Sequence, residues 1–304
     1  MSAPIQIDHF SDPGCPWAYS ASPAHALLRW RFGDQLDWRL HLIGLAEDGE
    51  RYIRRGYTPT RSAQGYRRFR RFGMPFGGQP RERVTGTGRA CRAVVAARVL
   101  APAHELEVFR ALQLAQFTTT LLLDTDDGIG DALRMFAPMV DAAAIVAAIG
   151  DARVETLYQE DRAAARTAAG SPTEAQGRSA NTDGAVRYTA PSLIFTTQDG
   201  RVLEAGGFQP VEAYDVCLAN LDPGLERRAP AEDPVEVLRV LPYAPTTREV
   251  AVCLAEHLTE PDDDATEAAL IAAAGEGRVR REIVGSGAVW HLARAEAGAL
   301  GRAA

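Results

Sequence analysis

Cys15 stands where a predicted strand meets a predicted helix, a position that can activate a thiol. Upstream, apolar residues alternate with polar ones over residues 5–10, and the turn sequence Asp12-Pro13-Gly14 follows. Downstream, apolar residues recur at helical spacing, and Pro16 suits the first helical position because its missing N–H costs nothing there. The unpaired N–H groups and the dipole at a helix N-terminus favour a thiolate. We therefore expect Cys15 to be a nucleophile with a pKa below the ordinary value of about 8.5.

The other cysteines predict neither a disulfide scaffold nor a zinc site. The sequence holds four widely spaced cysteines, Cys15, Cys91, Cys217 and Cys253, with no Cys-x-x-Cys pair. Cys91, Cys217 and Cys253 fall among apolar neighbours at helical spacing, which favours core packing. A role for Cys91 as a second, resolving thiol is the less favoured alternative. The sequence thus predicts one reactive thiol and three quieter ones.

The stretch from Ser11 to Tyr19 resembles the active-site turn of the DsbA family, in particular its FrnE-like branch, whose motif is Cys-Pro-Trp-Cys-Tyr. Ala18 replaces the second cysteine of that motif, so Cys15 cannot form a Cys-x-x-Cys disulfide. The resemblance covers about residues 4–221. It implies that Pro16 and Trp17 face the active-site surface, contribute to substrate binding and tune the thiol.

The same resemblance assigns a role to Pro191. In the thioredoxin fold of that family, the strand after a helical insertion opens with a cis-proline beside the catalytic cysteine, and Pro191 matches this position. The resemblance implies that Pro191 is catalytic together with Cys15. It also implies that the backbone of Ala190 helps to align the substrate.

The order of predicted elements indicates an α/β protein with a thioredoxin-like domain over residues 1–221. A strand, helix and strand are expected at Ile5–Phe10, Pro16–Phe32 and Leu36–Leu45, before an almost entirely helical insertion over about 51–180. Two strands, Ser192–Thr197 and Val202–Ala205, flank a turn signal, and a helix over Pro210–Leu221 follows. Residues 222–233 contain prolines and are predicted to form a linker.

Residues 234–304 are predicted to form a small C-terminal module. We expect helices at Pro234–Leu241, Thr247–Leu258 and Ala265–Ala274, then a hairpin with strands at Arg278–Val284 and Ala288–Leu292. Capping boxes are expected at Thr246 with Glu249 and at Asp264 with Glu267. This order resembles a winged helix, a module that binds DNA in many proteins.

The charge of this module argues against nucleic acid as a partner. Residues 232–304 hold 7 Arg against 13 Asp plus Glu, a net of −6 within a chain whose formal net charge is −7. Binding to duplex DNA depends on basic residues that neutralise phosphates. We therefore expect a packing or dimerisation role, with a homodimer as one candidate assembly.

The segment 51–83 is strongly basic and rich in aromatic residues. It carries ten Arg against the single acidic residue Glu82, interleaved with aromatic residues that include Tyr52, Tyr57, Tyr66, Phe69 and Phe72. A solvated helix face is the commoner meaning of such a pattern. Because the resemblance places the helical insertion over the catalytic cysteine, a pocket for an anionic ligand is the functional alternative.

The sequence shows no sign of a membrane or secreted protein. Residues 1–10 lack the basic start and the long apolar run of a signal peptide, and no apolar stretch is long enough to span a bilayer. At 304 residues the chain exceeds the usual size of one domain. We expect a cytoplasmic protein with no membrane partner and no tightly bound cofactor or metal.

The leading functional hypothesis is a DsbA-like oxidoreductase of monothiol type. Cys15 would attack a disulfide or an electrophilic small molecule, and an external thiol of the glutathione or mycothiol type would then release it. One alternative is a glutathione-type transferase or isomerase related to kappa-class transferases and hydroxychromene-carboxylate isomerases, which have Ser where this chain has Cys15. The other is a redox-responsive winged-helix regulator.

Overall fold

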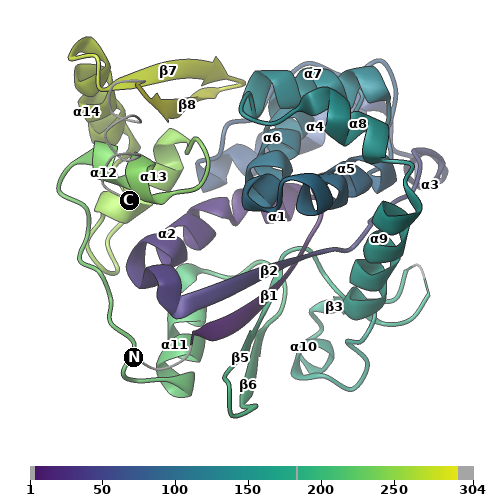
Figure 1. The fold of residues 1–304 in the computed structure, drawn as a ribbon, viewed down its shortest axis with the longest axis horizontal. Coiled ribbons are helices and arrows are strands. Elements are labelled where there is room, and N and C mark those ends of the chain that lie inside the picture. Colours follow the sequence, from purple (N-terminus) through teal and green to yellow (C-terminus); the bar gives the residue numbers. More distant parts are fainter. Residues whose placement is uncertain (1–3, 183, 294–304) are drawn as a thin grey trace.

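A four-stranded sheet forms the centre of the fold (Figure 1). The computed structural model describes residues 4–182 and 184–293. The strands lie in the order β2-β1-β5-β6, where β1 is Ile5–Ser11, β2 is Leu36–Leu42, β5 is Ser192–Thr196 and β6 is Val202–Ala205. β1 pairs with β2 in parallel and with β5 antiparallel, and β6 pairs antiparallel with β5. This mixed α/β arrangement confirms the thioredoxin-like fold.

Two helices cover one face of this sheet. α2 (Ser22–Phe32) and α11 (Val211–Leu221) place Leu28, Tyr214 and Leu218 against Ile7 and Phe195 of the strands, and all five side chains are fully buried. The crossover from β1 through α2 to β2 is the strand–helix–strand unit that the sequence predicts. β2 ends at Leu42, three residues earlier than expected.

The helix expected over residues 16–32 is two helices. α1 (Pro16–Ser20) ends and α2 begins on either side of Ala21. Pro23 lies in the first turn of α2 and has no N–H to continue the hydrogen-bond ladder, so the break follows from the sequence. Cys15 therefore precedes a helix of a single turn rather than a long one.

A large insertion lies between β2 and β5. Its elements are α3 (Glu50–Arg54), α4 (Pro59–Tyr66), the 3₁₀ helix η2 (Arg67–Phe72), α5 (Gly88–Leu100), η3 (Pro102–His104), α6 (Glu105–Thr118), α7 (Asp126–Phe136), α8 (Ala142–Ala148), α9 (Ala152–Ala165), α10 (Pro172–Ala175) and two-residue strands β3 (Ser179–Ala180) and β4 (Arg187–Tyr188). The expectation of an almost entirely helical segment is wrong at residues 73–87, which are irregular. Two prolines and four glycines in this stretch disfavour a helix.

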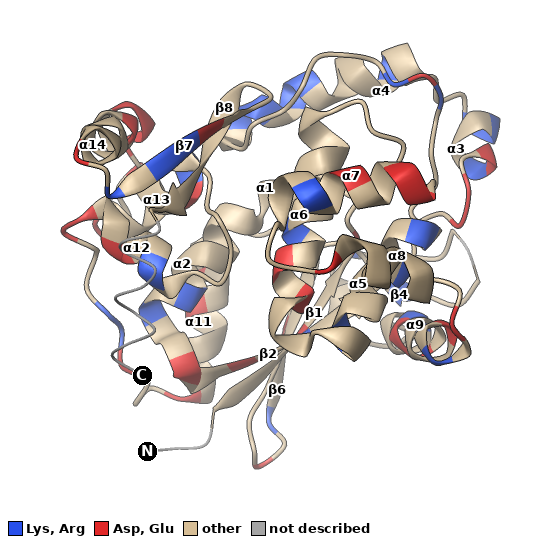
Figure 2. Cartoon of the chain, turned by 45° about the horizontal axis from the view of Figure 1, so that its top comes forward, with Lys and Arg blue, Asp and Glu red and all other residues tan. Residues whose placement is uncertain are grey.

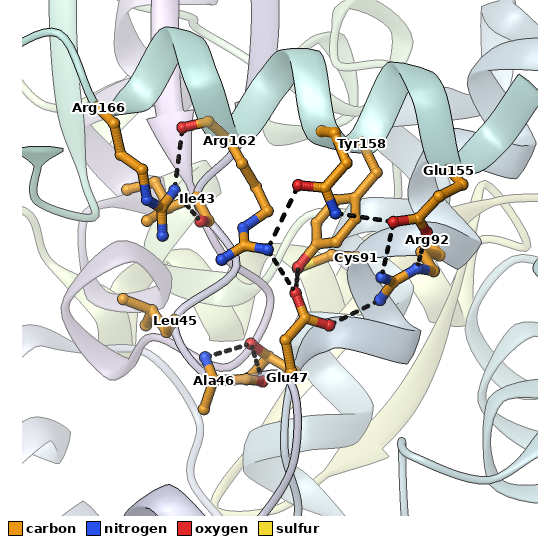
Figure 3. Close-up of polar contacts among 12 residues, drawn as sticks. Ile43, Leu45, Ala46, Glu47, Cys91, Arg92, Glu155, Tyr158, Arg162 and Arg166 are labelled. Carbon is orange, nitrogen blue, oxygen red and sulfur yellow. Dashed lines mark hydrogen bonds and ion pairs between the residues drawn. The ribbon is translucent and has the colours of Figure 1, made fainter. Parts of the chain in front are cut away.

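The loop after β2 is fastened to the insertion through Glu47 (Figure 3). Its carboxylate accepts hydrogen bonds from the Tyr158 hydroxyl and the Arg92 guanidinium, at 2.8 Å each, and lies 3.0 Å from the guanidinium of Arg162. These partners belong to α5 and α9, and Arg92 also pairs with Glu155 at 2.6 Å. The loop that faces the start of α1 is thereby held between the sheet and the insertion.

The C-terminal part has the expected order of three helices and a hairpin. The elements are α12 (Pro234–Val240), α13 (Thr247–Leu254), α14 (Asp263–Gly275), β7 (Val279–Val284) and β8 (Gly287–Leu292). The capping box of Thr246 and Glu249 is confirmed. The second box is wrong, because α14 begins earlier and Asp262 caps it by accepting a hydrogen bond from the N–H of Ala265.

This module packs against α2 and the insertion. Trp30 of α2 shares a buried cluster with Val250 and Trp290 of the module. Arg110 of α6 forms a buried ion pair with Glu249 of α13, at 2.9 Å, and also donates a hydrogen bond to the Ser22 hydroxyl at 2.7 Å. The domain limits and the winged-helix assignment remain predictions. Across the two described ranges, no helix has the length and apolar character needed to cross a membrane.

Candidate active site

Cys15 lies at the junction of β1 and α1, with its sulfur against a distant part of the chain. It occupies the N-cap position of α1 in extended conformation (φ −88°, ψ 114°), and Pro16 starts the helix. Its Sγ donates a hydrogen bond to the carbonyl oxygen of Ala190 at 3.1 Å. The Ala190–Pro191 peptide bond is cis, as the resemblance implies. The structure thus brings together Cys15, Ala190 and Pro191, which the sequence analysis selected separately.

The thiol of Cys15 has a raised pKa, contrary to the expectation from its place at a helix start. Only 6% of the residue is exposed, and this burial, with the nearby Asp12 carboxylate as a smaller cause, raises the pKa of Cys15 to about 12. The N–H groups of Ala18 and Trp17 and the charge of Arg187 oppose the rise. The helix-start effect is present, but desolvation outweighs it.

Asp12 fixes the turn that carries the cysteine. Its carboxylate accepts hydrogen bonds from the N–H of Gly14 at 2.8 Å, the N–H of Leu45 at 2.8 Å and the Thr87 hydroxyl at 3.0 Å. Cys91 Sγ lies 3.6 Å from the same carboxylate and is fully buried in the core. Burial raises the pKa of Asp12. Sequence reasoning treated Asp12 only as a turn residue and did not select Arg187, because no local motif marks either.

Trp17 forms one side of an aromatic surface next to the cysteine. Its ring lies 4.9 Å from that of Phe69 and 5.4 Å from that of Phe208, between centroids, and 41% of the residue remains exposed. Phe69 comes from the insertion and Phe208 from the loop before α11. The predicted substrate-binding residue Trp17 therefore offers an apolar surface at the place where the two parts of the domain meet.

A pocket of about 750 Å³ opens beside this surface, between the cysteine turn and the insertion. Gly14, Pro16 and Trp17 line it, whereas the buried Cys15, between Gly14 and Pro16 in the chain, is not among the lining residues. Eight arginines also line it: Arg51, Arg55, Arg61, Arg68, Arg71, Arg81, Arg83 and Arg187. Figure 2 shows the basic residues of α4 and its surroundings. The Arg-rich segment 51–83 is thus a pocket wall rather than only a solvated helix face.

Within the described part of the chain, no group of three or more His, Cys, Asp and Glu side chains is placed to hold a metal ion, and all four cysteines are free.

Comparison with known proteins gives a likeness of structure. No family model and no curated protein matches the sequence. A structure described as a protein disulfide isomerase, from Nitrosomonas europaea, matches with a TM-score of 0.55 and 15% identity over 73% of this chain and 99% of that one. One described as a DsbA oxidoreductase, from Streptomyces coelicolor, matches with a TM-score of 0.51 and 16% identity over 75% and 93%. The cytosolic disulfide reductase DsbM from Pseudomonas aeruginosa has 20% identity and a TM-score of 0.49 over 72% and 98%. The chain has the thioredoxin fold with a helical insertion that DsbA-like proteins share.

Proposed function

We propose that this protein is a thiol-dependent oxidoreductase in which Cys15 is the single nucleophile. The observation that carries the proposal is the position of the Cys15 sulfur. It lies at the start of α1, 3.1 Å from the Ala190 carbonyl oxygen and beside the cis peptide bond of Pro191, with a ligand-sized pocket adjacent. This arrangement suits a substrate that lies along the Ala190–Pro191 backbone with a sulfur or electrophilic carbon next to Cys15.

The proposed reaction is a thiol–disulfide exchange in two steps. The Cys15 thiol loses its proton to solvent, and the thiolate attacks a disulfide to form a mixed disulfide and release a thiolate. The N–H groups of Trp17 and Ala18 face the sulfur and stabilise its negative charge. A second, external thiolate then attacks the mixed disulfide and restores the Cys15 thiolate, because Ala18 supplies no resolving sulfur.

The buried state of the thiol sets the pH behaviour of this reaction. Exchange rates depend on the fraction of thiolate, and the raised pKa of Cys15 keeps that fraction low in the free protein near neutral pH. The proposal therefore expects the attack step to accelerate as the pH rises. A substrate that displaces the Ala190 carbonyl from the sulfur would favour the same ionisation.

The test is to follow adduct formation and turnover with bis(2-hydroxyethyl) disulfide and a small thiol. The wild type should form a mixed disulfide at Cys15, detected by mass spectrometry, and Cys15→Ser should abolish both adduct and turnover. Cys217→Ser is the control. Because Cys217 lies on α11, this variant is expected to keep turnover within about twofold of the wild type. Turnover that survives in Cys15→Ser contradicts the monothiol proposal and favours a transferase or isomerase that needs only a hydroxyl.

The regulator hypothesis receives no support from the exposed face of α14. The exposed positions of α14 are Asp264, Ala265, Ala268, Ala269, Ile271, Ala272 and Gly275, and none is basic. A helix that enters a DNA groove needs basic residues on that face or beside it. We therefore keep the enzyme as the proposed function and the module as its structural support.

A further inference from the structure

The pocket beside Cys15 gathers many positive charges. Eight arginines line it, and none of its described lining residues is Asp or Glu. In the described chain, no carboxylate lies within ion-pair distance of Arg55, Arg61, Arg68, Arg71 or Arg81, whereas Arg83 pairs with Asp124. The protein is acidic as a whole, so this wall concentrates positive charge against the general trend. A ligand that fits it must carry several negative charges.

The arrangement of the arginines favours phosphate over carboxylate as the anionic group. Arg55 and Arg68 are exposed and lie before and after α4 in the chain, and buried Arg187 comes from β4 near the cysteine. A cluster of guanidinium groups distributed in this way matches the several oxygens of phosphate groups. Single carboxylates would leave most of these charges unneutralised.

The charge of the wall also discriminates among small thiols. Glutathione carries an ammonium group beside one of its carboxylates, and an ammonium group favours an acidic partner, which the described lining residues do not include. Mycothiol carries no charge and would gain nothing from the arginines. Tyr52, Tyr57, Tyr66 and Phe69 also line the pocket and offer flat surfaces on which a nucleobase can stack.

We propose that the pocket binds a thiol, or the disulfide of a thiol, whose far end carries phosphate groups and a nucleobase. The proposal rests on the proposed function, because it assigns the second thiol of that reaction. The phosphate groups bind the arginines, and the sulfur arm reaches Cys15 past Gly14 and Trp17. The bound thiolate attacks the Cys15 mixed disulfide at the substrate sulfur, so that Cys15 Sγ is the leaving group. The electron pair of the broken S–S bond remains on the departing sulfur, so the step needs no further oxidant or reductant.

Coenzyme A and pantetheine test this assignment, because they share the same thiol arm and differ in the phosphates and the adenine. The full chain is first treated with bis(2-hydroxyethyl) disulfide, which forms the mixed disulfide of Cys15 with 2-mercaptoethanol and releases one 2-mercaptoethanol. The rate at which each thiol then restores free Cys15 is measured at equal concentrations. We expect coenzyme A to release the mixed disulfide about tenfold faster than pantetheine, or more. This ratio of rates corresponds to the free energy of one to two charge-assisted hydrogen bonds. The double variant Arg55→Ser/Arg68→Ser should bring the ratio of the two rates toward one. Arg54→Ser is the matched control, since Arg54 is exposed, pairs with Glu50 and does not line the pocket.

The outcomes separate the two proposals. Equal rates with both thiols, or a ratio unchanged in the double variant, overturn the phosphate assignment and leave the monothiol function intact. Failure to form any Cys15 mixed disulfide overturns both the monothiol function and the phosphate assignment. A further experiment offers coenzyme A disulfide to the reduced protein, to distinguish substrate from cosubstrate. If the rate at which Cys15 attacks this disulfide depends on the phosphate groups, the pocket binds the incoming disulfide. Competition by a short single-stranded oligonucleotide, but not by adenosine 3′,5′-bisphosphate, would instead show a nucleic-acid surface and overturn the proposal.

Discussion

The sulfur of Cys15 and the carbonyl oxygen of Ala190 lie 3.1 Å apart, although the residues are separated by 175 positions in the chain. The insertion occupies most of that interval, so the sheet has to bring β1 and the start of β5 together before the site exists. The contact also bears on the protonation state of Cys15 in the free protein. A thiol can donate this hydrogen bond and a thiolate cannot, so the carbonyl favours the protonated form, as burial does.

The first prediction concerns the acidity of Cys15. Its alkylation rate in a variant with Cys15 as the only cysteine should rise with pH well beyond 9, in line with a pKa of about 12. Asp12→Asn should lower the pKa, because a negative charge that disfavours the thiolate is lost, and Arg187→Met should raise it. The measurement is the iodoacetamide rate against pH. A midpoint below about 8.5 in the wild type would show that the helix start outweighs burial.

The second prediction concerns the missing cysteine. Ala18→Cys should introduce dithiol chemistry, because residues 15 and 18 lie one turn apart at the start of α1. The variant should form an internal disulfide and reduce insulin repeatedly, whereas the wild type should do so poorly. Ala18→Ser, of the same size but without a thiol, serves as the control. Equal turnover by the wild type would mean that another cysteine resolves the mixed disulfide, and Cys91 would be the first to replace.

The third prediction concerns the buried ion pair between Arg110 and Glu249. Both side chains are nearly inaccessible, so Arg110→Met leaves the Glu249 carboxylate buried without its charged partner. The free energy of unfolding should fall by about 3–5 kcal/mol. Arg54→Met, which breaks an exposed pair with Glu50, should change it by less than about 0.5 kcal/mol. Denaturant titration of both variants would settle whether the pair joins the module to the insertion as described.

The fourth prediction concerns acid stability. His9 and His25 are buried with ring centroids 4.6 Å apart, and burial lowers the pKa of His9 well below its usual value and that of His25 to about 3. Protonation therefore favours the unfolded chain. This contribution to stability is complete above about pH 6.5 and declines as the pH falls, by up to about 1.4 kcal/mol per pH unit for each histidine. His25→Phe should reduce the slope of unfolding free energy against pH below 6.5, and an unchanged slope would contradict the assignment.

The fifth prediction concerns the C-terminal module. Removal of residues 230–304 should expose Trp30 and its apolar neighbours on α2 and leave Arg110 without Glu249. We expect a lower melting temperature, more binding of a hydrophobic dye and lower solubility than for the full chain. The full chain should also show no steeply salt-dependent binding to duplex DNA. A 1–229 chain that is equally stable and active, with micromolar duplex binding by residues 230–304, would favour the regulator.

The local patterns of the sequence determined much of the architecture. Alternating apolar residues and turn signals predicted β1, β5 and β6, and the capping box at Thr246 marked the start of α13, because these signals act over a few residues. The motif resemblance selected Cys15 and Pro191. Local patterns failed where a neighbouring residue overrode them, as at Pro23, which divides the first helix, and at Asp262, which caps α14 in place of Asp264.

Only the tertiary structure decided the chemical state of the site. The sequence places Cys15 at a helix start, which lowers a thiol pKa, but the number of atoms that surround the sulfur depends on the whole fold and reverses the direction. In the same way, seven arginines between residues 51 and 83 became a pocket wall only because the insertion folds back over the start of α1 and meets Arg187 from β4. Burial and the clustering of charge depend on distances between residues far apart in the sequence, which no local pattern contains.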